Sequence, residues 1–438
     1  MTDVATAVSD PAQEPRRPSL RRLVAATEID LRLFGMVAAL VGMLLVFGII
    51  TGGRILSPSN LVTMSVQAAS VAIISTGMVI IIVSRNIDLS VGSIVGVTAM
   101  TYALLMAGTG ILTDVLGRGH PLTWIIALGI GLGVGALLGA LQGFIIAYVG
   151  VPSFIVTLGG LLAFRGVVWV MSGGQGVAGL DLTFQILGGG PQGSLGGTLS
   201  WVVGIVVCVG IVGLLIYSRR QRRRFGFPVR PKWAEVFIGV VGCLATLALV
   251  FIANSYLWPQ PLAERWALEH GVSIPPGGLR IESGIPWPIL LLVIVALVMS
   301  FLANRRRFGR YIYAIGGNPE AAELAGINTR RTVLKSFVLM GVLCALSGAV
   351  AAARLNAASL DVGRGYELYV IAATVIGGTS LSGGIGTIPG AILGALVMAT
   401  LAYGLQYIGL SSPYQDIAAG LVLIVAVGLD SWNRRRAT

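Results

Sequence analysis

NRRRFGRYIYAIGGNPEAAELAGINTRRT, residues Asn304–Thr332, is the longest charged and patterned segment of a mostly apolar chain. Apolar runs flank it on both sides, Pro288–Ala303 before it and Val333–Ala353 after it. A membrane-spanning helix needs about 20 mostly apolar residues, and clustered arginines beside such spans mark the cytoplasmic side. The segment is therefore predicted to be a cytoplasmic loop between two spans.

A short helix is predicted inside this loop, because capping residues stand at both of its ends. Asn318 can accept a hydrogen bond from the first-turn N–H groups, and Pro319 follows at the first helical position. Gly326 can take the left-handed conformation that ends a helix. The residues of this helix are Asn318, Pro319, Glu320, Ala321, Ala322, Glu323, Leu324 and, at its end, Gly326.

Two interpretations of this helix are open. A helix of about two turns is not stable by itself, so it can be part of a solvated loop. Alternatively, it is a docking helix that enters a groove of a cytoplasmic partner. The complete capping and the surrounding arginines favour docking; these arginines are Arg305, Arg306, Arg307, Arg310, Arg330 and Arg331.

The composition is that of a polytopic membrane protein. The 438 residues are 55% hydrophobic and 11% charged, whereas soluble domains carry about 25% charged residues. The net charge of +12 does not indicate nucleic-acid binding, because most arginines lie in clusters beside apolar runs. These clusters are Arg16–Arg32, Arg219–Lys232, Arg305–Arg331 and Arg434–Arg436. The three cysteines lie within apolar runs, so neither a disulfide framework nor a metal site is expected.

The hydropathy pattern predicts an all-α transmembrane bundle of about 10 to 12 spans. Apolar segments lie near residues 33–51, 61–83, 91–107, 123–149, 153–171, 199–217, 236–256, 287–303, 333–354, 367–380, 387–409 and 415–430. If all the basic clusters are cytoplasmic, both termini are cytoplasmic and the number of crossings is even. The outer loops are then Gly108–Leu122, Ser172–Thr198 and Leu257–Pro286.

The expected organisation is one membrane domain with two tails. Residues 1–30 are predicted to be a disordered cytoplasmic tail, 31–430 the membrane domain, and 431–438 a cytoplasmic tail. The membrane domain includes a basic cytoplasmic loop over 218–235 and the loop 304–332 described above.

Two glycine ridges predict close helix packing. Glycines recur every four residues at 131, 135, 139 and 143, and again at 386, 390 and 394. Such a ridge lets two helix backbones approach closely, so its role is expected to be structural.

Two polar breaks interrupt apolar stretches toward opposite ends of the chain, which suggests two related halves. They are SRNIDLSVGS, Ser84–Ser93, and GGTSLSGGIGTIPG, Gly377–Gly390. Interrupted spans in corresponding positions are typical of a transport site. Asp88 either caps the helix that begins near Val91 or contacts substrate, and Arg165 either pairs with Asp88 or extends to the outer surface.

The chain itself is not expected to be an enzyme. A P-loop ATPase needs a lysine preceded by glycine, G-x-x-x-x-G-K-[ST]. The chain has two lysines, Lys232 after Pro231 and Lys335 after Leu334, so the motif is absent. No catalytic cluster of Ser/His/Asp, Cys/His or paired carboxylates is apparent in the sequence.

Four motifs in order resemble the membrane permeases of bacterial ABC importers for monosaccharides, the ribose/xylose/galactose group. They are NIDLSVGS (Asn86–Ser93), VPSFIVTLGGLLAFRG (Val151–Gly166), FGRYIYAIGGNPEAAELAGIN (Phe308–Asn328) and GRGYELYVIAATVIGGTSLSGGIGTIPGAILGAL (Gly363–Leu396). The resemblance extends from about residue 35 over nearly the whole chain. The long segment Arg219–Pro286 is more similar to the xylose type, while Ser84-Arg85-Asn86 replaces the more usual glycine-rich lead into IDLSVG.

The resemblance implies a permease subunit for a monosaccharide, most of all a pentose such as xylose, in the bacterial cytoplasmic (inner) membrane. It implies a second permease copy, a tandem-domain cytoplasmic ATPase that binds ATP and Mg²⁺, and a periplasmic or surface sugar-binding protein. No cofactor or metal is then expected on this chain, and Asn318–Gly326 is the coupling helix that docks in the ATPase. The candidate pathway residues are Asn86, Asp88, Ser90, Arg165, Glu367, Thr379 and Ser380.

In the mechanism that the resemblance implies, ATP binding moves both coupling helices and rocks the membrane halves. Sugar then enters a cavity lined by the polar breaks. The alternative is an ion-coupled secondary sugar transporter, which would also have broken helices and a midplane acid. A lipid or polysaccharide flippase or a structural membrane subunit would explain the composition but not the four motifs.

Overall fold

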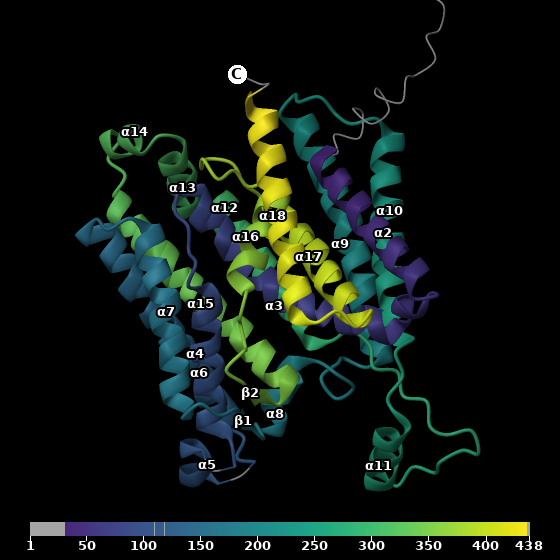
Figure 1. The fold of residues 1–438 in the computed structure, drawn as a ribbon. Helices are drawn as coiled ribbons and strands as arrows, with labels where there is room; N and C mark the ends of the chain where they lie inside the picture. The colour runs from purple at the N-terminus through teal and green to yellow at the C-terminus, as the bar shows by residue number, and fades with distance from the viewer. Residues whose placement is uncertain (1–30, 109, 118, 436–438) are drawn as a thin grey trace, which may run out of the picture.

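The computed structural model describes residues 31–108, 110–117 and 119–435, which fold into a helical bundle (Figure 1). The long helices are α2 (Leu31–Ile50), α3 (Pro58–Val83), α4 (Val91–Met106), α6 (Thr123–Phe144), α7 (Ser153–Ser172), α9 (Gly197–Arg224), α10 (Lys232–Asn254), α12 (Trp287–Arg305), α15 (Thr329–Leu355), α17 (Ile388–Tyr407) and α18 (Ser412–Arg435). The predicted tail over 1–30 and Arg436 lie outside the described residues.

Shorter elements connect the long helices. They are α5 (Ile111–Leu116), α8 (Leu182–Gln185), α11 (Gln260–His270), α13 (Arg307–Gly317), α14 (Pro319–Leu324) and α16 (Tyr366–Ile376), with the single turns η1 (Arg54–Leu56), η2 (Ile145–Val149) and η3 (Ile186–Gly188). Strands β1 (Val177–Ala178) and β2 (Ala357–Ala358) pair in antiparallel register, with Val177 opposite Ala358.

The predicted transmembrane helical bundle is confirmed. Ten helices of the described chain are long and apolar enough to cross a membrane, and two shorter apolar helices cover Tyr366–Ile376 and Ser412–Val425. Each apolar segment identified in the sequence overlaps a helix of the structure. These helices agree with the expected range of about 10 to 12 spans.

The loops separate into two ends of the bundle, as the positive-inside rule predicts. Figure 1 places α14, the connection between α9 and α10, and the C-terminal end of α18 at one end, and α5, α8 and α11 at the opposite end. The basic clusters of the described chain therefore share one end, and the three predicted outer loops share the other.

Two helices differ from the hydropathy pattern. The apolar run of α9 ends near Tyr217, but the helix continues through a segment with five arginines and ends at Arg224. Arginine has a high helix propensity, and positive charge is favourable at a helix C-terminus, so the basic segment extends the helix instead of forming a loop. The charged loop after α12 likewise begins with an amphipathic helix, α13, that hydropathy alone did not indicate.

The core is formed by α3, α4 and α15. Of the apolar window of α3, 94% is buried, against 11% for α9, so α9 lies at the periphery. The glycine ridge of α6 packs on α15: a Cβ at Gly135 would overlap the Gly341 carbonyl oxygen, and a Cβ at Gly139 would overlap that of Phe337. Gly394 of the second ridge makes the same close approach to Ala373 of α16. The predicted packing role of both ridges is confirmed.

Candidate functional site

The short helix α14 has the predicted caps. Asn318 Oδ1 accepts a hydrogen bond from Ala321 N at 3.1 Å, and Pro319 is the first helical residue. Gly326 takes the left-handed conformation with φ +81°, and its N–H donates to the Glu323 carbonyl oxygen at 2.9 Å. Both ends of the helix are therefore set by its own sequence.

The exposed face of α14 carries an apolar side chain. Ala322 is buried against the body of the protein, whereas Leu324 is 90% exposed. Immediately after α14, Asn328 Oδ1 accepts from Arg331 N at 2.8 Å and caps the long helix α15. Two capped helices joined by so short a connection hold Leu324 in a fixed position at the end of the bundle.

The two polar breaks meet at the C-terminal end of α13, directly before α14. Arg85 of the first break donates from Nε to the Gly316 carbonyl oxygen and from Nη2 to that of Gly317, both at 2.8 Å. Gly384 N of the second break donates to the Val83 carbonyl oxygen at 3.0 Å. The motifs Ser84–Ser93 and Gly377–Gly390 therefore meet beside the residues directly before α14, in a region that we call the junction.

The junction is tightly packed around Gly316. A Cβ at this position would overlap the Val83 carbonyl oxygen, whereas a Cβ at Gly317 would meet nothing within 4 Å. The Tyr313 hydroxyl donates to the Gly386 carbonyl oxygen at 2.7 Å, and burial raises the pKa of this phenol. Arg85 itself has φ +63°, a left-handed backbone that only a few per cent of non-glycine residues adopt.

Asp88 has the geometry of a helix-start residue. One carboxylate oxygen, Oδ1, accepts from Ser90 N at 2.9 Å and from the Ser90 hydroxyl at 2.6 Å, directly before α4. Asp88 is buried, so these local bonds compensate its removal from water. The side-chain amide of the neighbouring Asn86 donates to the Ser84 carbonyl oxygen at 3.0 Å, so it also forms a local hydrogen bond within the first break. The bonds from Ser90 to Asp88 close a turn directly before α4, whose N-cap residue Ser90 makes no side-chain cap hydrogen bond, so capping and substrate contact both stay predictions for Asp88.

Gln142 of α6 joins this group from across the bundle. Its amide oxygen lies 2.9 Å from Ser90 Oγ, while its Nε2 is buried without a partner. The Ser90 hydroxyl has one proton, which it donates to the closer Asp88 carboxylate. If the Gln142 amide is rotated by 180°, its Nε2 can donate to Ser90 Oγ, and both side chains are then hydrogen-bonded. Gly160 makes room for this amide, because a Cβ there would overlap it. Neither Gln142 nor Gly160 was singled out from the sequence.

Arg165 does not pair with Asp88; that alternative is wrong. Its guanidinium donates from Nη1 to the carbonyl oxygens of Leu360 at 3.2 Å and Val362 at 3.3 Å, in the loop after α15. Glu367, in the first turn of α16 after this loop, has an Oε2 that is buried without a hydrogen-bond partner. The outward alternative for Arg165 agrees with these contacts.

Arg165 also lines a cleft of about 270 Å³ near the C-terminal end of α7. The other lining residues are Trp169, Leu360, Asp361 and Arg364. Asp361 and Arg364 form an exposed ion pair at 3.4 Å. An aromatic face beside a carboxylate and guanidinium groups offers stacking and hydrogen bonding to a polyhydroxylated ligand. Trp169, Asp361 and Arg364 were missed, because their proximity depends on residues almost 200 positions apart.

The last two candidates lie in the second break. Thr379 Oγ1 is buried without a hydrogen-bond partner, and Ser380 Oγ lies 2.9 Å from Ser382 Oγ. Of the seven candidate pathway residues, Asn86, Asp88, Ser90, Thr379 and Ser380 belong to the two breaks. The other two lie beside the first break and the helix that follows it: Glu367 Oε2 packs against Gly92, and Arg165 Nη1 lies near Gly96. The role of all these candidates in transport stays a prediction.

Comparison with known proteins gives consistent matches over most of the chain. The family model described as branched-chain amino acid transport system / permease component matches residues 60–427. The xylose transport system permease protein XylH of Escherichia coli K12 is 37% identical over 410 residues, 93% of this chain and 94% of that protein. XylH of Haemophilus influenzae is 33% identical over 93% of this chain and 98% of that protein.

A ribose permease is a more distant relative. The ribose import permease protein RbsC of Escherichia coli K12 is 29% identical over 85% of this chain and 86% of that protein. No solved structure matches.

Proposed function

The chain belongs to the transport-system permease family whose model matches residues 60–427, and from this premise we propose that it is the membrane subunit of an ATP-driven importer for a xylose-type pentose. The relatives named for xylose transport cover 93% of the chain, whereas the ribose permease covers less of it at lower identity. Xylose is therefore the proposed substrate and ribose the nearest alternative.

The observation that carries this proposal is the exposed helix α14. An ATP-driven importer whose permease lacks a P-loop motif needs a second subunit to bind ATP and Mg²⁺, and the permease must offer that subunit a docking element. α14 is capped at both ends and presents Leu324 at the arginine-rich end of the bundle. An isolated apolar side chain on a helix fits a groove of a partner protein.

The outer cleft supports a sugar as the substrate. Trp169 and the charged groups of Arg165, Asp361 and Arg364 line one cleft at the end opposite α14. We propose that sugar reaches the permease from this side, delivered by a sugar-binding protein, and that both chain termini face the cytoplasm. Two copies of the permease would enclose the path between them.

Coupling would pass through the junction. Arg85 holds the carbonyl oxygens of Gly316 and Gly317, and Gly384 contacts Val83, so a displacement of α14 reaches both polar breaks directly. In this proposal, ATP binding on the partner moves α14, and the breaks transmit the movement to α3, α4, α16 and α17.

Purification in mild detergent from native membranes tests the subunit composition. A tandem-domain ATPase at fixed stoichiometry is the expected partner, and proteoliposomes with that ATPase and the binding protein should take up xylose only with ATP. A clean permease without ATPase after cross-linking, with uptake that a protonophore abolishes, would instead establish an ion-coupled transporter. The sugar bound by a co-purified binding protein then distinguishes xylose from ribose.

A further inference from the structure

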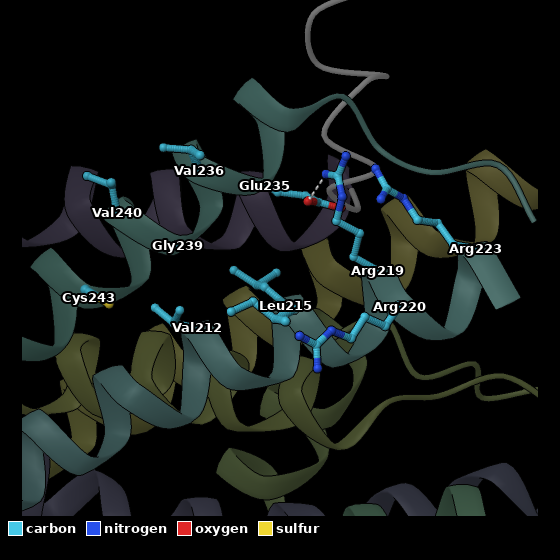
Figure 2. A pocket seen from close by; sticks show the side chains of 11 residues that line it. Val212, Leu215, Arg219, Arg220, Arg223, Glu235, Val236, Gly239, Val240 and Cys243 are labelled. Carbon is cyan, nitrogen blue, oxygen red and sulfur yellow. Dashed lines mark hydrogen bonds and ion pairs between the residues drawn. The ribbon is translucent and has the colours of Figure 1, made fainter.

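The hairpin of α9 and α10 holds a crevice that the proposed transport function does not use (Figure 2). The two helices pack on each other at the periphery of the bundle, and α10 also contacts α3. The crevice has a volume of about 520 Å³, which is within the range of about 300–1,000 Å³ typical of ligand clefts. The connection between α9 and α10 lies at the same end of the molecule as α14 (Figure 1).

The floor of the crevice is apolar. Gly239 is one of the lining residues, and a Cβ there would come within 3.3 Å of Leu215 Cδ1, so the absence of a side chain widens the groove. Val212, Val236 and Val240 line the floor and are exposed. In a membrane, these side chains contact hydrocarbon.

The rim of the crevice is positively charged. Arg219 forms an ion pair with Glu235 across the hairpin, and this pair is mostly buried. Arg220 and Arg223 line the same crevice, and within the described chain neither is paired with a carboxylate. Figure 2 shows the side chain of Arg219 extending from α9 to Glu235 of α10, and the side chain of Arg223 extending from α9 on the same side as Arg219. The single carboxylate leaves the rim with a net charge of about +2.

Aromatic side chains locate the rim at the membrane surface. Phe225 and Phe227 are exposed in the turn between α9 and α10, and Trp233 is exposed in the first turn of α10, all close in sequence to the arginines. Aromatic and basic side chains are enriched where membrane spans meet the headgroup region. The apolar floor thus faces the acyl chains, and the basic rim faces the phosphates of the same leaflet.

We propose that this crevice binds one anionic phospholipid of the cytoplasmic leaflet. Its phosphate would contact Arg220 and Arg223, and one acyl chain would lie along Val212, Gly239 and Val240. Charge complementarity selects the anionic headgroup, because basic clusters between spans attract anionic lipids and guanidinium groups bind phosphate through paired donors. The apolar floor selects a lipid over a free anion. The assignment of the leaflet rests on the orientation proposed with the transport function.

Lipid binding is measured on the purified, delipidated permease by native mass spectrometry with phosphatidylglycerol. The double substitution Arg220→Gln/Arg223→Gln is expected to weaken binding roughly tenfold to thirtyfold, at about 1 kcal/mol per basic residue. The matched control Arg224→Gln/Arg305→Gln removes two exposed arginines from outside the crevice and should leave binding within about twofold. A further variant, Val240→Trp, fills the floor without changing charge and should also weaken binding several-fold.

The outcomes separate this site from non-specific attraction. Equal weakening by both arginine pairs, or equal binding of phosphatidylcholine by the wild type, would overturn the proposal, as would competition by millimolar inorganic phosphate. Size-exclusion chromatography verifies that each variant is folded. Because binding is measured without ATPase or sugar, its loss is distinguishable from failure of the importer proposal, which appears as absence of ATP-dependent xylose uptake.

Discussion

Asp88 shows how a single buried carboxylate can be satisfied within its own turn. Its Oδ1 accepts from the N–H and the hydroxyl of Ser90, and Gln142 contacts the same hydroxyl from α6. The group links the start of α4 to α6 and needs no cationic partner. We therefore expect the acceptor oxygen of Asp88 to be more important for the fold than its negative charge.

Asp88→Ala and Asp88→Asn are expected to differ for this reason. Asn keeps an acceptor for Ser90 N, so insertion and yield should be normal, whereas Ala leaves buried donors unpaired and should destabilise the protein by about 1–3 kcal/mol. Unfolding of the purified variants in detergent measures the difference. A folded Asn variant that has lost transport would assign the charge a role in the pathway, and equal destabilisation by both changes would contradict the acceptor argument.

At the scale of elements, α6 and α15 are held together by backbone contact. Gly135→Val places a side chain against the Gly341 carbonyl oxygen and 2.7 Å from Ala345 Cβ, so we expect a loss of about 1–3 kcal/mol or more and a low yield. Gly133→Val on the same helix is the matched control, because a Cβ there meets nothing within 4 Å. Similar yield and unfolding of the two variants would contradict the packing role of the ridge.

The docking role of α14 is tested by changing its exposed face. Glu320→Lys with Leu324→Asp should abolish co-purification of the ATPase and ATP-dependent uptake, while the permease still folds, because Leu324 makes few contacts of its own. Leu182→Asp introduces the same change at another exposed leucine at the opposite end and should keep both activities. Assembly and uptake that survive the α14 double substitution would show that the ATPase binds elsewhere.

At the scale of the whole molecule, the junction connects the docking helix to helices of both polar breaks. Gly316→Ala should separate α13 from Val83, so the ATPase still binds and hydrolyses ATP while xylose uptake falls at least about tenfold, equivalent to about 1.4 kcal/mol. Gly317→Ala is the control, since the space at Gly317 is open. Xylose uptake and ATP hydrolysis measured in the same proteoliposomes give the amount of xylose transported per ATP hydrolysed. An unchanged value of this ratio in Gly316→Ala would exclude the junction as the coupling path.

Local features of the chain set the helices, their ends and the packing ridges. The apolar runs, the Asn318 cap and the glycines spaced four apart act through neighbours within one or two turns, so the sequence alone predicted them. The resemblance of four motifs also gave the permease family, which the comparisons confirm.

Contacts between distant segments were decided only by the tertiary structure. Arg85 and Gly316 are 231 residues apart, and no local pattern indicates that they meet. The same holds for the partners of Arg165, for Gln142 beside Ser90, and for the crevice between α9 and α10. Hydropathy gives each span a length and a mean polarity. Which helices are neighbours, and which side chains face each other, follows only from packing the whole bundle, because two helices that pack closely leave no room for a third between them.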